Sequence, residues 1–329
     1  MEKFGKLKGL NKSLGLKFPE EKIPTRNGYG DALVELGRNK KFMVLCADLT
    51  DSTRVKKFAE KYPKQFVEIG VAEQNLVTVA AGLAAMGKVP FVSSYAMFCP
   101  GRCWEQIRTT ICYNDQNVKV IGAHAGVSVG PDGATHQALE DIAIMRSLPN
   151  MIVVVPADYE QTRKATKAIG RFKGPAYMRF ARNKTSQFTS RKTPFEIGKA
   201  QILKSGKDIV IIGAGPVVYE CLLAAEKLQA EGIQAQVINS HTIKPLDKKT
   251  ILAAAKKCKY VLTVEEAQVI GGLGGAVAEL LGENYPVPLK RVGVQDHYGE
   301  SGSPDKLLKK FGFSAEHIFK EAVKLRGKG

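Results

Sequence analysis

Short apolar runs alternate with amphipathic stretches along most of the chain, and this alternation constrains the fold more than any other feature. In the first half, apolar runs predict strands at residues 43–47, 66–69, 89–93, 118–123, 151–155 and 176–180. Helices are predicted between them at residues 54–62, 72–86, 102–113, 138–147 and 158–169. Strands that alternate with helices in this way favour a doubly wound parallel sheet, so we expect an α/β fold.

The alternation stops at a polar stretch, residues 183–193, and then starts again. Strands are predicted at residues 208–212, 234–238, 260–264 and 289–294, with helices at 217–230, 248–257, 274–281 and 304–310. A chain of 329 residues is long enough for two such domains. We therefore expect two doubly wound domains, at residues 25–189 and 190–329. A lysine-rich arm at residues 1–24 is expected to be solvated or, alternatively, to wrap around another subunit.

Composition narrows the choice of partners and compartment. The formal net charge of +17 favours nucleic acid, phosphorylated metabolites or an acidic protein as partner. The lysines are spread along the chain rather than clustered with interleaved aromatics, which argues against nucleic acid. No apolar run reaches the roughly 20 residues that span a membrane, and no signal peptide is evident. The six cysteines include no Cys-x-x-Cys pair, so we expect reduced thiols and a cytoplasmic protein.

Polar and aromatic side chains follow the predicted strands of the first domain. The carboxyl ends of parallel strands share one edge of a sheet, and ligands bind in the crevice beyond that edge. The residues that follow these strands are Asp48, Leu49, Ser52, Glu73, Tyr95, Phe98, His124, Asp132, His136 and Arg182. The sequence therefore predicts a ligand site at this edge.

The same loops carry a family resemblance. Residues 68–75, EIGVAEQN, and the small-residue run at 79–83 resemble the pyrimidine-binding signature of the transketolase family. Residues 132–137 (DGATHQ), 146–150 (RSLPN) and 156–158 (PAD) resemble the family's next segment, and residues 241–247 (HTIKPLD) its C-terminal domain. The resemblance runs from about residue 24 to the end. It implies a domain that binds the pyrimidine of thiamine diphosphate, followed by a smaller transketolase C-terminal-like domain.

The resemblance also implies roles at the cofactor. Glu73 matches the catalytic glutamate that hydrogen-bonds a ring nitrogen of the aminopyrimidine. Phe98 matches the aromatic residue that stacks on this ring, and Tyr95 matches the aromatic one helical turn before it. Asp48 and Leu49 match positions near the thiazolium ring. In this family the cofactor carries the chemistry and the protein tunes it.

Further residues match the family's substrate site, which implies a sugar phosphate. Arginine suits this role because its planar fork of donors matches a phosphate. The phosphate-binding positions are Arg26, Ser52, His124 and Arg182. Asp132 and His136 match residues that bind the sugar hydroxyls, with His136 close to the carbonyl end and counted as catalytic. The implied reaction is transfer of a two-carbon ketol unit between sugar phosphates in the pentose phosphate pathway.

The diphosphate half of the cofactor site is missing from this sequence. The family holds the diphosphate through a divalent metal, using a Gly-Asp-Gly motif and a downstream asparagine, but Gly30 and Asp31 are followed by alanine. No metal ligand is therefore predicted in this chain. The resemblance implies that an N-terminal subunit binds Mg²⁺ or Ca²⁺, that the cofactor is shared, and that the enzyme is an α2β2 assembly active only when both subunits are present.

Other interpretations remain open. The family includes 1-deoxy-D-xylulose-5-phosphate synthase, which usually has arginine in place of His124, and the beta subunits of 2-oxo acid dehydrogenases, which lack the loop from Asp132 to His136. A non-catalytic paralogue that kept the fold is another alternative. Gly213 and Gly215 form part of a dinucleotide fingerprint, but Val218 replaces the third glycine, which makes NAD binding a weak prediction.

Overall fold

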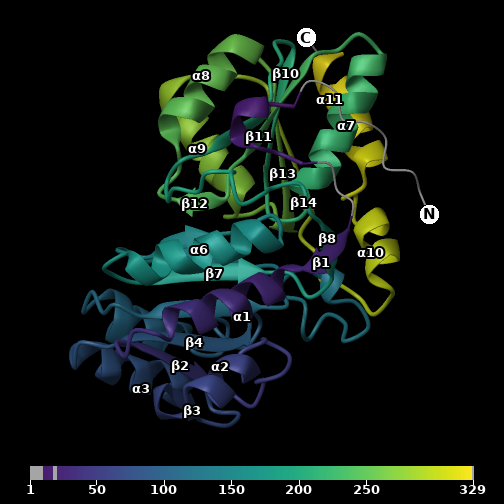
Figure 1. The fold of residues 1–329 in the computed structure, drawn as a ribbon. Helices are drawn as coiled ribbons and strands as arrows, with labels where there is room; N and C mark the ends of the chain where they lie inside the picture. The colour runs from purple at the N-terminus through teal and green to yellow at the C-terminus, as the bar shows by residue number, and fades with distance from the viewer. Residues whose placement is uncertain (1–9, 18–20, 328–329) are drawn as a thin grey trace.

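Two β-sheets, one in each half of the chain, organise the computed structural model, which describes residues 10–17 and 21–327. The first sheet and its helices form the lower part of the molecule in Figure 1, and the second sheet forms the upper part. Both sheets consist mainly of parallel strands with helices on both faces, which confirms the predicted α/β class of two doubly wound domains.

The first sheet has seven strands. Its strands are β2 (Phe42–Cys46), β3 (Phe66–Glu68), β4 (Val89–Tyr95), β5 (Lys119–Ala123), β6 (Ile152–Val154), β7 (Ala176–Phe180) and β12 (Thr242–Lys244). They lie in the order β12-β6-β7-β5-β4-β2-β3, and all pairs are parallel except β12 with β6. The first parallel strand along the chain, β2, has the next strand, β3, on one side and the one after that, β4, on the other. The chain leaves β2 toward β3 and then crosses to β4. This is the switch point where doubly wound sheets bind ligands.

Helices cover both faces of this sheet. One face carries α1 (Thr25–Leu36), α2 (Lys56–Lys61) and α6 (Tyr159–Arg171). The other carries α3 (Glu73–Ala85), α4 (Trp104–Gln106), the π-helical η3 (Ile107–Cys112) and α5 (Asp141–Arg146). Short 3-10 turns occur at η2 (Pro63–Gln65) and η4 (Val127–Val129). The helix expected at residues 102–113 is therefore a short α-helical turn followed by a π-helical one.

Helix α1 was not predicted, because two glycines weaken its helical pattern. The structure gives the reason for one of them. A Cβ atom on Gly28 would lie 2.2 Å from the carbonyl oxygen of Tyr159, at the start of α6. Glycine therefore lets α1 approach α6 closely, and Arg26 lies two residues earlier on the same helix.

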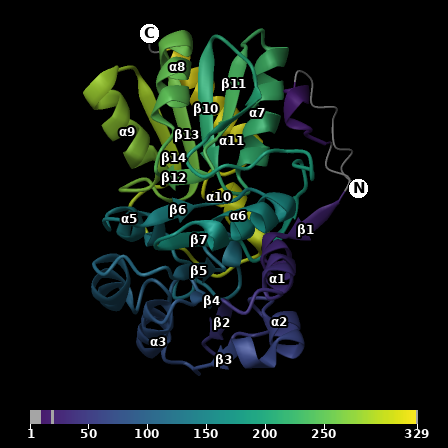
Figure 2. The same cartoon turned by 60° about the vertical axis from the view of Figure 1, so that its left-hand side comes forward.

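The second sheet has five strands. They are β9 (Gln201–Lys204), β10 (Ile209–Ala214), β11 (Ala235–Asn239), β13 (Val261–Gln268) and β14 (Leu289–Val294), in the order β14-β13-β10-β11-β9. Helices α7 (Val218–Ala230) and α11 (Ala315–Arg326) pack on one face, and α8 (Lys248–Cys258) and α9 (Leu273–Asn284) pack on the other. Figure 2 shows α9 and α7 on opposite sides of this sheet. The antiparallel edge strand β9 and the helix α11 were not predicted from the sequence.

The second domain packs against the first sheet through the loops at the carboxyl ends of its own strands. The amide of Gly215, after β10, donates to the carbonyl of Val155, and the amide of Val155 donates to the carbonyl of His241, after β11. Strand β12 continues this contact along the edge of β6. The loop that resembles a dinucleotide fingerprint is thus packed against the first domain at this edge.

The N-terminal residues that the structure describes lie against the protein. The amide of Asn11 donates to Leu203, and the hydroxyl of Ser190 donates to Gly15, while η1 (Lys12–Leu14) lies between these contacts. The expectation of a solvated arm is therefore wrong for residues 10–17. Strand β1 (Lys22–Pro24) pairs antiparallel with β8 (Lys184–Ser186). The other residues expected in the arm, 1–9 and 18–20, lie outside the described part of the chain.

Helix α10 (Pro304–Lys310) also bridges the two domains, because it lies beside the first-domain turn η4. Figure 1 shows it below α7 and α11, next to the first domain. Within residues 10–17 and 21–327, no helix is both long and apolar enough to cross a membrane.

Candidate active site

The carboxyl ends of β2, β3, β4, β5 and β7 meet at one edge of the first sheet, because these strands run parallel. Their loops, together with the start of α1, carry the residues that the sequence analysis singled out. Direct contacts join Arg26, Tyr95, Phe98, His124 and His136, and Arg102 links Glu73 to Phe98. These side chains form two neighbouring groups, one around Glu73 and Phe98 and one around Arg26 and His124.

Glu73 is the first residue of α3, as expected from its place after a short strand. Only 1% of its side chain is exposed. Its carboxylate accepts a hydrogen bond of 2.7 Å from Nη1 of Arg102 and one of 3.3 Å from Oγ of Ser94. A buried carboxylate with these few protein donors keeps acceptor capacity for another donor.

Aromatic rings lie beside this carboxylate. Tyr95 and Phe98 are nearly parallel, with ring centroids 6.1 Å apart and an angle of 17° between their planes. The ring of His136 meets Phe98 edge-on at 5.2 Å. The Arg102 guanidinium carbon lies 4.9 Å from the Phe98 centroid. Phe98 thus presents a ring face that already holds a planar nitrogen group.

The second group surrounds a buried histidine. Nη1 of Arg26 lies 3.2 Å from Nε2 of His124 and donates to the backbone carbonyl of Ser52 at 3.0 Å. Because a guanidinium can only donate, Nε2 of His124 must accept, which places its proton on Nδ1. That Nδ1 is buried and has no hydrogen-bond partner among the described residues. The His124 ring also lies 4.1 Å from the ring of Tyr95, which joins the two groups.

Positive charge accumulates around this histidine. Burial lowers the pKa of His124 to about 3, with smaller contributions from Arg26, Arg182 and Arg54. Burial and the charges of Arg54 and Arg182 also lower the pKa of Arg26. Three arginines that repel one another around a neutral histidine favour a bound anion. Arg54 belongs to this set and was missed in the sequence.

The glycine-rich loop from His124 to His136 closes the site. Arg182 donates to the carbonyl of Val129 at 2.9 Å and pairs with Asp132 at 3.2 Å. The second domain holds the same loop, because the buried Glu266 of β13 accepts a 2.6 Å hydrogen bond from the amide of Ser128. The C-terminal domain therefore helps to position the loop that carries Asp132 and His136.

Comparison with known proteins decides the family. The model of the transketolase pyrimidine-binding domain matches residues 21–187, and that of the transketolase C-terminal domain matches residues 198–318. The chain belongs to the transketolase family. The sequence resemblance is thereby confirmed. The family depends on thiamine diphosphate, which agrees with the predicted cofactor.

Two relatives match over almost their whole length. The chain is 46% identical over 303 residues to a putative transketolase C-terminal section of Methanocaldococcus jannaschii, covering 91% of this chain and 95% of that protein. It is 42% identical over 314 residues to a 6-deoxy-6-sulfo-D-fructose transketolase subunit of a Clostridium strain, with 95% and 97% covered. This transketolase chain thus corresponds in extent to the C-terminal subunits of split transketolases.

A solved structure described as a split gene transketolase, inactive beta4 tetramer, superposes with a TM-score of 0.85 at 45% identity. The match covers 93% of this chain and 99% of that one. Both the arrangement of the two domains and the sequence are therefore shared with a split transketolase subunit.

The transketolase residues around Glu73 fit the pyrimidine end of the cofactor. The Arg102 guanidinium shows that a flat group with nitrogen donors can lie on Phe98 and bond Glu73 at the same time. Asp48 and Leu49 lie on the loop after β2, at the same edge of the sheet. The amide of Asp48 donates to Glu68 at 2.8 Å, and the same carboxylate accepts from Gly70, so the loops after β2 and β3 are tied together.

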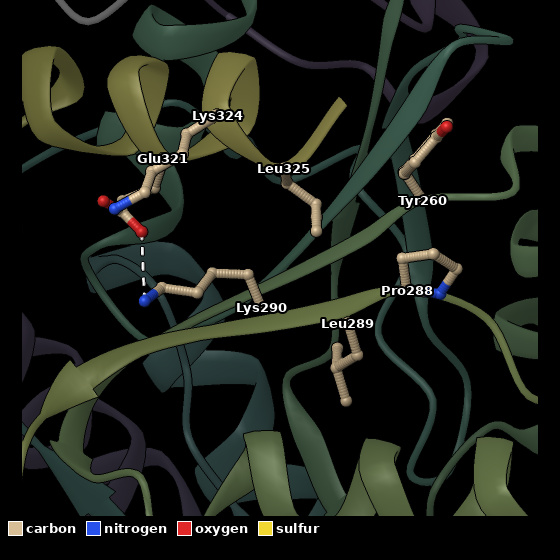
Figure 3. A pocket seen from close by; sticks show the side chains of 7 residues that line it. All are labelled: Tyr260, Pro288, Leu289, Lys290, Glu321, Lys324 and Leu325. Atoms are coloured by element: carbon tan, nitrogen blue, oxygen red, sulfur yellow. Dashed lines mark ion pairs between the residues drawn. The ribbon is translucent and has the colours of Figure 1, made fainter. Parts of the chain in front are cut away.

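The diphosphate end has no such candidate. Across the described part of the chain, no three His, Cys, Asp or Glu side chains are grouped to hold a metal ion. A cavity of about 260 Å³ does lie in the second domain, where Figure 3 shows the paired side chains of Lys290 and Glu321 facing each other across it. It opens at the amino ends of β13 and β14, away from the carboxyl edges, and so is not part of the transketolase site.

The sequence missed three residues that the structure places at this site. Arg102 bonds Glu73 from 29 positions away, and Glu266 reaches Ser128 from 138 positions away. No local spacing reveals such pairs. Arg54 follows the predicted phosphate residue Ser52 by two positions, and that proximity was the one signal available for it.

Proposed function

We propose that this chain is the C-terminal subunit of a two-chain transketolase that transfers a two-carbon ketol unit between sugar phosphates, as in the pentose phosphate pathway. The observation that carries the proposal is the buried Glu73 carboxylate beside the face of Phe98. The Arg26–His124 group lies on the same edge of the sheet and supplies the anion site.

Thiamine diphosphate supplies, when bound, a thiazolium carbon that carries the two-carbon unit. The chain's own part is to hold and orient. Phe98 offers a face for the pyrimidine ring, flanked by Tyr95, and Glu73 forms a hydrogen bond at a ring nitrogen. Asp48 and Leu49, on the loop after β2, would contact the thiazolium end, as the family resemblance implies. Burial of the Glu73 carboxylate keeps water from competing for that hydrogen bond.

The sugar phosphate is proposed to bind between the two groups. Arg26, Arg182 and the Nδ1 proton of His124 are donors for the phosphate, with Ser52 on the adjoining loop. Asp132 and His136 would accept or donate hydrogen bonds at the sugar hydroxyls. His136, whose ring lies 5.2 Å from that of Phe98, would be at the carbonyl end, as the family resemblance implies. The relative that acts on a sulfo sugar supports an anion at this position, since sulfonate and phosphate share that chemistry.

A second polypeptide is proposed to complete the site. An N-terminal subunit would bind the diphosphate through Mg²⁺ or Ca²⁺, and the cofactor would lie between the subunits of an α2β2 enzyme. The lack of a metal-binding group in the described residues and the likeness to split transketolase sections support this.

We assign residues 25–189 to the pyrimidine-binding domain and 190–329 to the C-terminal domain. Six free thiols suit a cytoplasmic enzyme.

Reconstitution tests the proposal. The chain is combined with a candidate N-terminal subunit, thiamine diphosphate and Mg²⁺, and ketol transfer from a ketose phosphate to an aldose phosphate is measured. Transfer is expected only when both chains are present. A complex that consumes pyruvate in place of the ketose donor would indicate a 1-deoxy-D-xylulose-5-phosphate synthase. An assembled complex that turns over neither donor would indicate a non-catalytic paralogue.

A further inference from the structure

Arg102 contacts both Glu73 and Phe98, the two side chains that would hold the cofactor ring in the proposed function. Its Nη1 donates to Oε2 of Glu73 at 2.7 Å, and its guanidinium carbon lies 4.9 Å from the Phe98 centroid. The side chain is 51% exposed, whereas that of Glu73 is 1% exposed. The guanidinium therefore reaches from solvent over the ring to a buried carboxylate.

A guanidinium resembles the nitrogen-bearing edge of an aminopyrimidine. Both are planar, both carry nitrogen atoms that can hydrogen-bond a carboxyl group, and both can stack on an aromatic face. Arg102 therefore occupies, on Phe98 and Glu73, contacts that an aminopyrimidine would make. Two flat groups cannot make the same contacts at once.

From this geometry we propose that the Arg102 side chain occupies the pyrimidine-binding position when no cofactor is bound and is displaced by the cofactor. Its guanidinium leaves Glu73 and Phe98 when the cofactor ring binds, so Arg102 lowers the affinity of the enzyme for thiamine diphosphate. The inference rests on the proposed function and adds a control on cofactor binding to it. Arg102 acts here as a competitor for the contacts with Glu73 and Phe98 and takes no part in the chemistry.

The different environments of the two partners make this exchange feasible. Removing a buried carboxylate's partner is costly, because the charge is left unpaired. Arg102 pairs with Glu73 until another donor arrives, so the carboxylate is never left with Ser94 as its one side-chain donor. The arginine can afterwards extend into water, where a charged head group is well solvated. The exchange therefore leaves no buried charge without a partner.

The proposal fixes the direction in which a variant must change binding. Replacing Arg102 with methionine removes the competing group and leaves Glu73 less well paired in the cofactor-free state. Both effects favour the bound state. If Arg102 occupies the pyrimidine-binding position in about nine-tenths of the cofactor-free molecules, the apparent affinity for thiamine diphosphate falls by about tenfold, because only the remaining molecules can bind it.

The test uses the assembled two-subunit enzyme with Mg²⁺, titrated with thiamine diphosphate in a calorimeter. Arg102→Met is expected to lower the Kd about tenfold. Arg108→Met, an exposed arginine on the adjoining π-helical segment, is the matched control and should leave the Kd unchanged. An unchanged or higher Kd for Arg102→Met would overturn the proposal, because it would make the arginine neutral or a ligand of the cofactor.

A second readout keeps structure and function apart. Without cofactor, the Arg102→Met complex should unfold at a lower temperature than the wild type, and the Arg108→Met complex should not. Arg102→Gln provides a polar replacement if methionine prevents assembly, with the same expected directions. If the wild-type complex binds no thiamine diphosphate, the proposed function fails; if it binds and Arg102→Met is unchanged, the inference about Arg102 alone fails.

Discussion

The guanidinium of Arg26 lies 3.2 Å from Nε2 of His124, a histidine that is 1% exposed and whose pKa is lowered to about 3. Burial is the main cause and three arginines add to it. The ring is therefore neutral at physiological pH and carries its proton on Nδ1. This relationship links an anion site to the stability of the fold in acid.

Acid should destabilise the chain partly through this histidine. The folded pKa lies below the ordinary value of 6.5, so the unfolded chain takes up the proton first as the pH falls. The stability that His124 retains above pH 6.5 is lost progressively between pH 6.5 and about 3. At pH 5 the loss is about 2 kcal/mol, from roughly 1.4 kcal/mol for each pH unit below 6.5.

Urea unfolding at pH 8 and pH 5 checks this prediction. His124→Asn removes the titrating ring, so the variant should lose about 2 kcal/mol less than the wild type between the two pH values. The buried His241, whose pKa is also lowered to about 3, should give the same result when replaced by asparagine. Equal pH dependence in wild type and His124→Asn would rule the histidine out as a source.

Glu73→Gln should abolish turnover of the assembled enzyme. The amide keeps the shape of the side chain but cannot supply a carboxylate at the ring nitrogen, and such proton-handling groups contribute about 10²–10⁴-fold. Assembly should be intact, as judged by light scattering. Glu105→Gln, an exposed glutamate on α4, is the matched control and should retain wild-type kcat. Turnover near normal in Glu73→Gln would mean that this carboxylate has another role.

Arg182→Ala should weaken binding of phosphorylated donors selectively. The guanidinium is a proposed phosphate ligand, so KM for a ketose phosphate should rise far more than KM for an unphosphorylated ketose. Arg182 also contacts Val129 and Asp132 of the loop. The variant Arg182→Lys keeps the positive charge but not the planar set of donors, so it distinguishes the effect of the charge from that of the loop contacts. Arg191→Ala, an exposed arginine, serves as control. A similar rise for both donors would remove Arg182 from the phosphate site.

The isolated chain should bind thiamine diphosphate weakly and show negligible ketol transfer. In the proposed function its residues would supply the pyrimidine contacts, and its described residues hold no group of three metal ligands for the diphosphate. Calorimetry and a coupled assay on the purified chain, with and without the N-terminal subunit, provide the comparison. Full activity of the single chain would contradict the two-subunit enzyme.

The sequence predicted most of the regular elements because their apolar periodicity is local. It predicted neither α1, whose Gly28 serves a close helix–helix contact, nor the side of the molecule on which residues 10–17 lie. Glu73 and Asp132 were predicted as site residues because a loop motif carries each of them, and their roles stay proposals. Arg102 and Glu266 were missed because each acts on a residue far away in the chain, a relation that packing alone reveals.

Strand β12 belongs to the second half of the chain but completes the edge of the first sheet. A gene break anywhere between the two domains would leave the backbone of β6 unpaired along that side, and unpaired edges of this kind lead to aggregation. We therefore expect the two domains to be encoded together on one chain. A different N-terminal partner could be joined to this pair of domains without disturbing them. A break between the two domains would leave a first domain that is expected to associate through the exposed edge of β6.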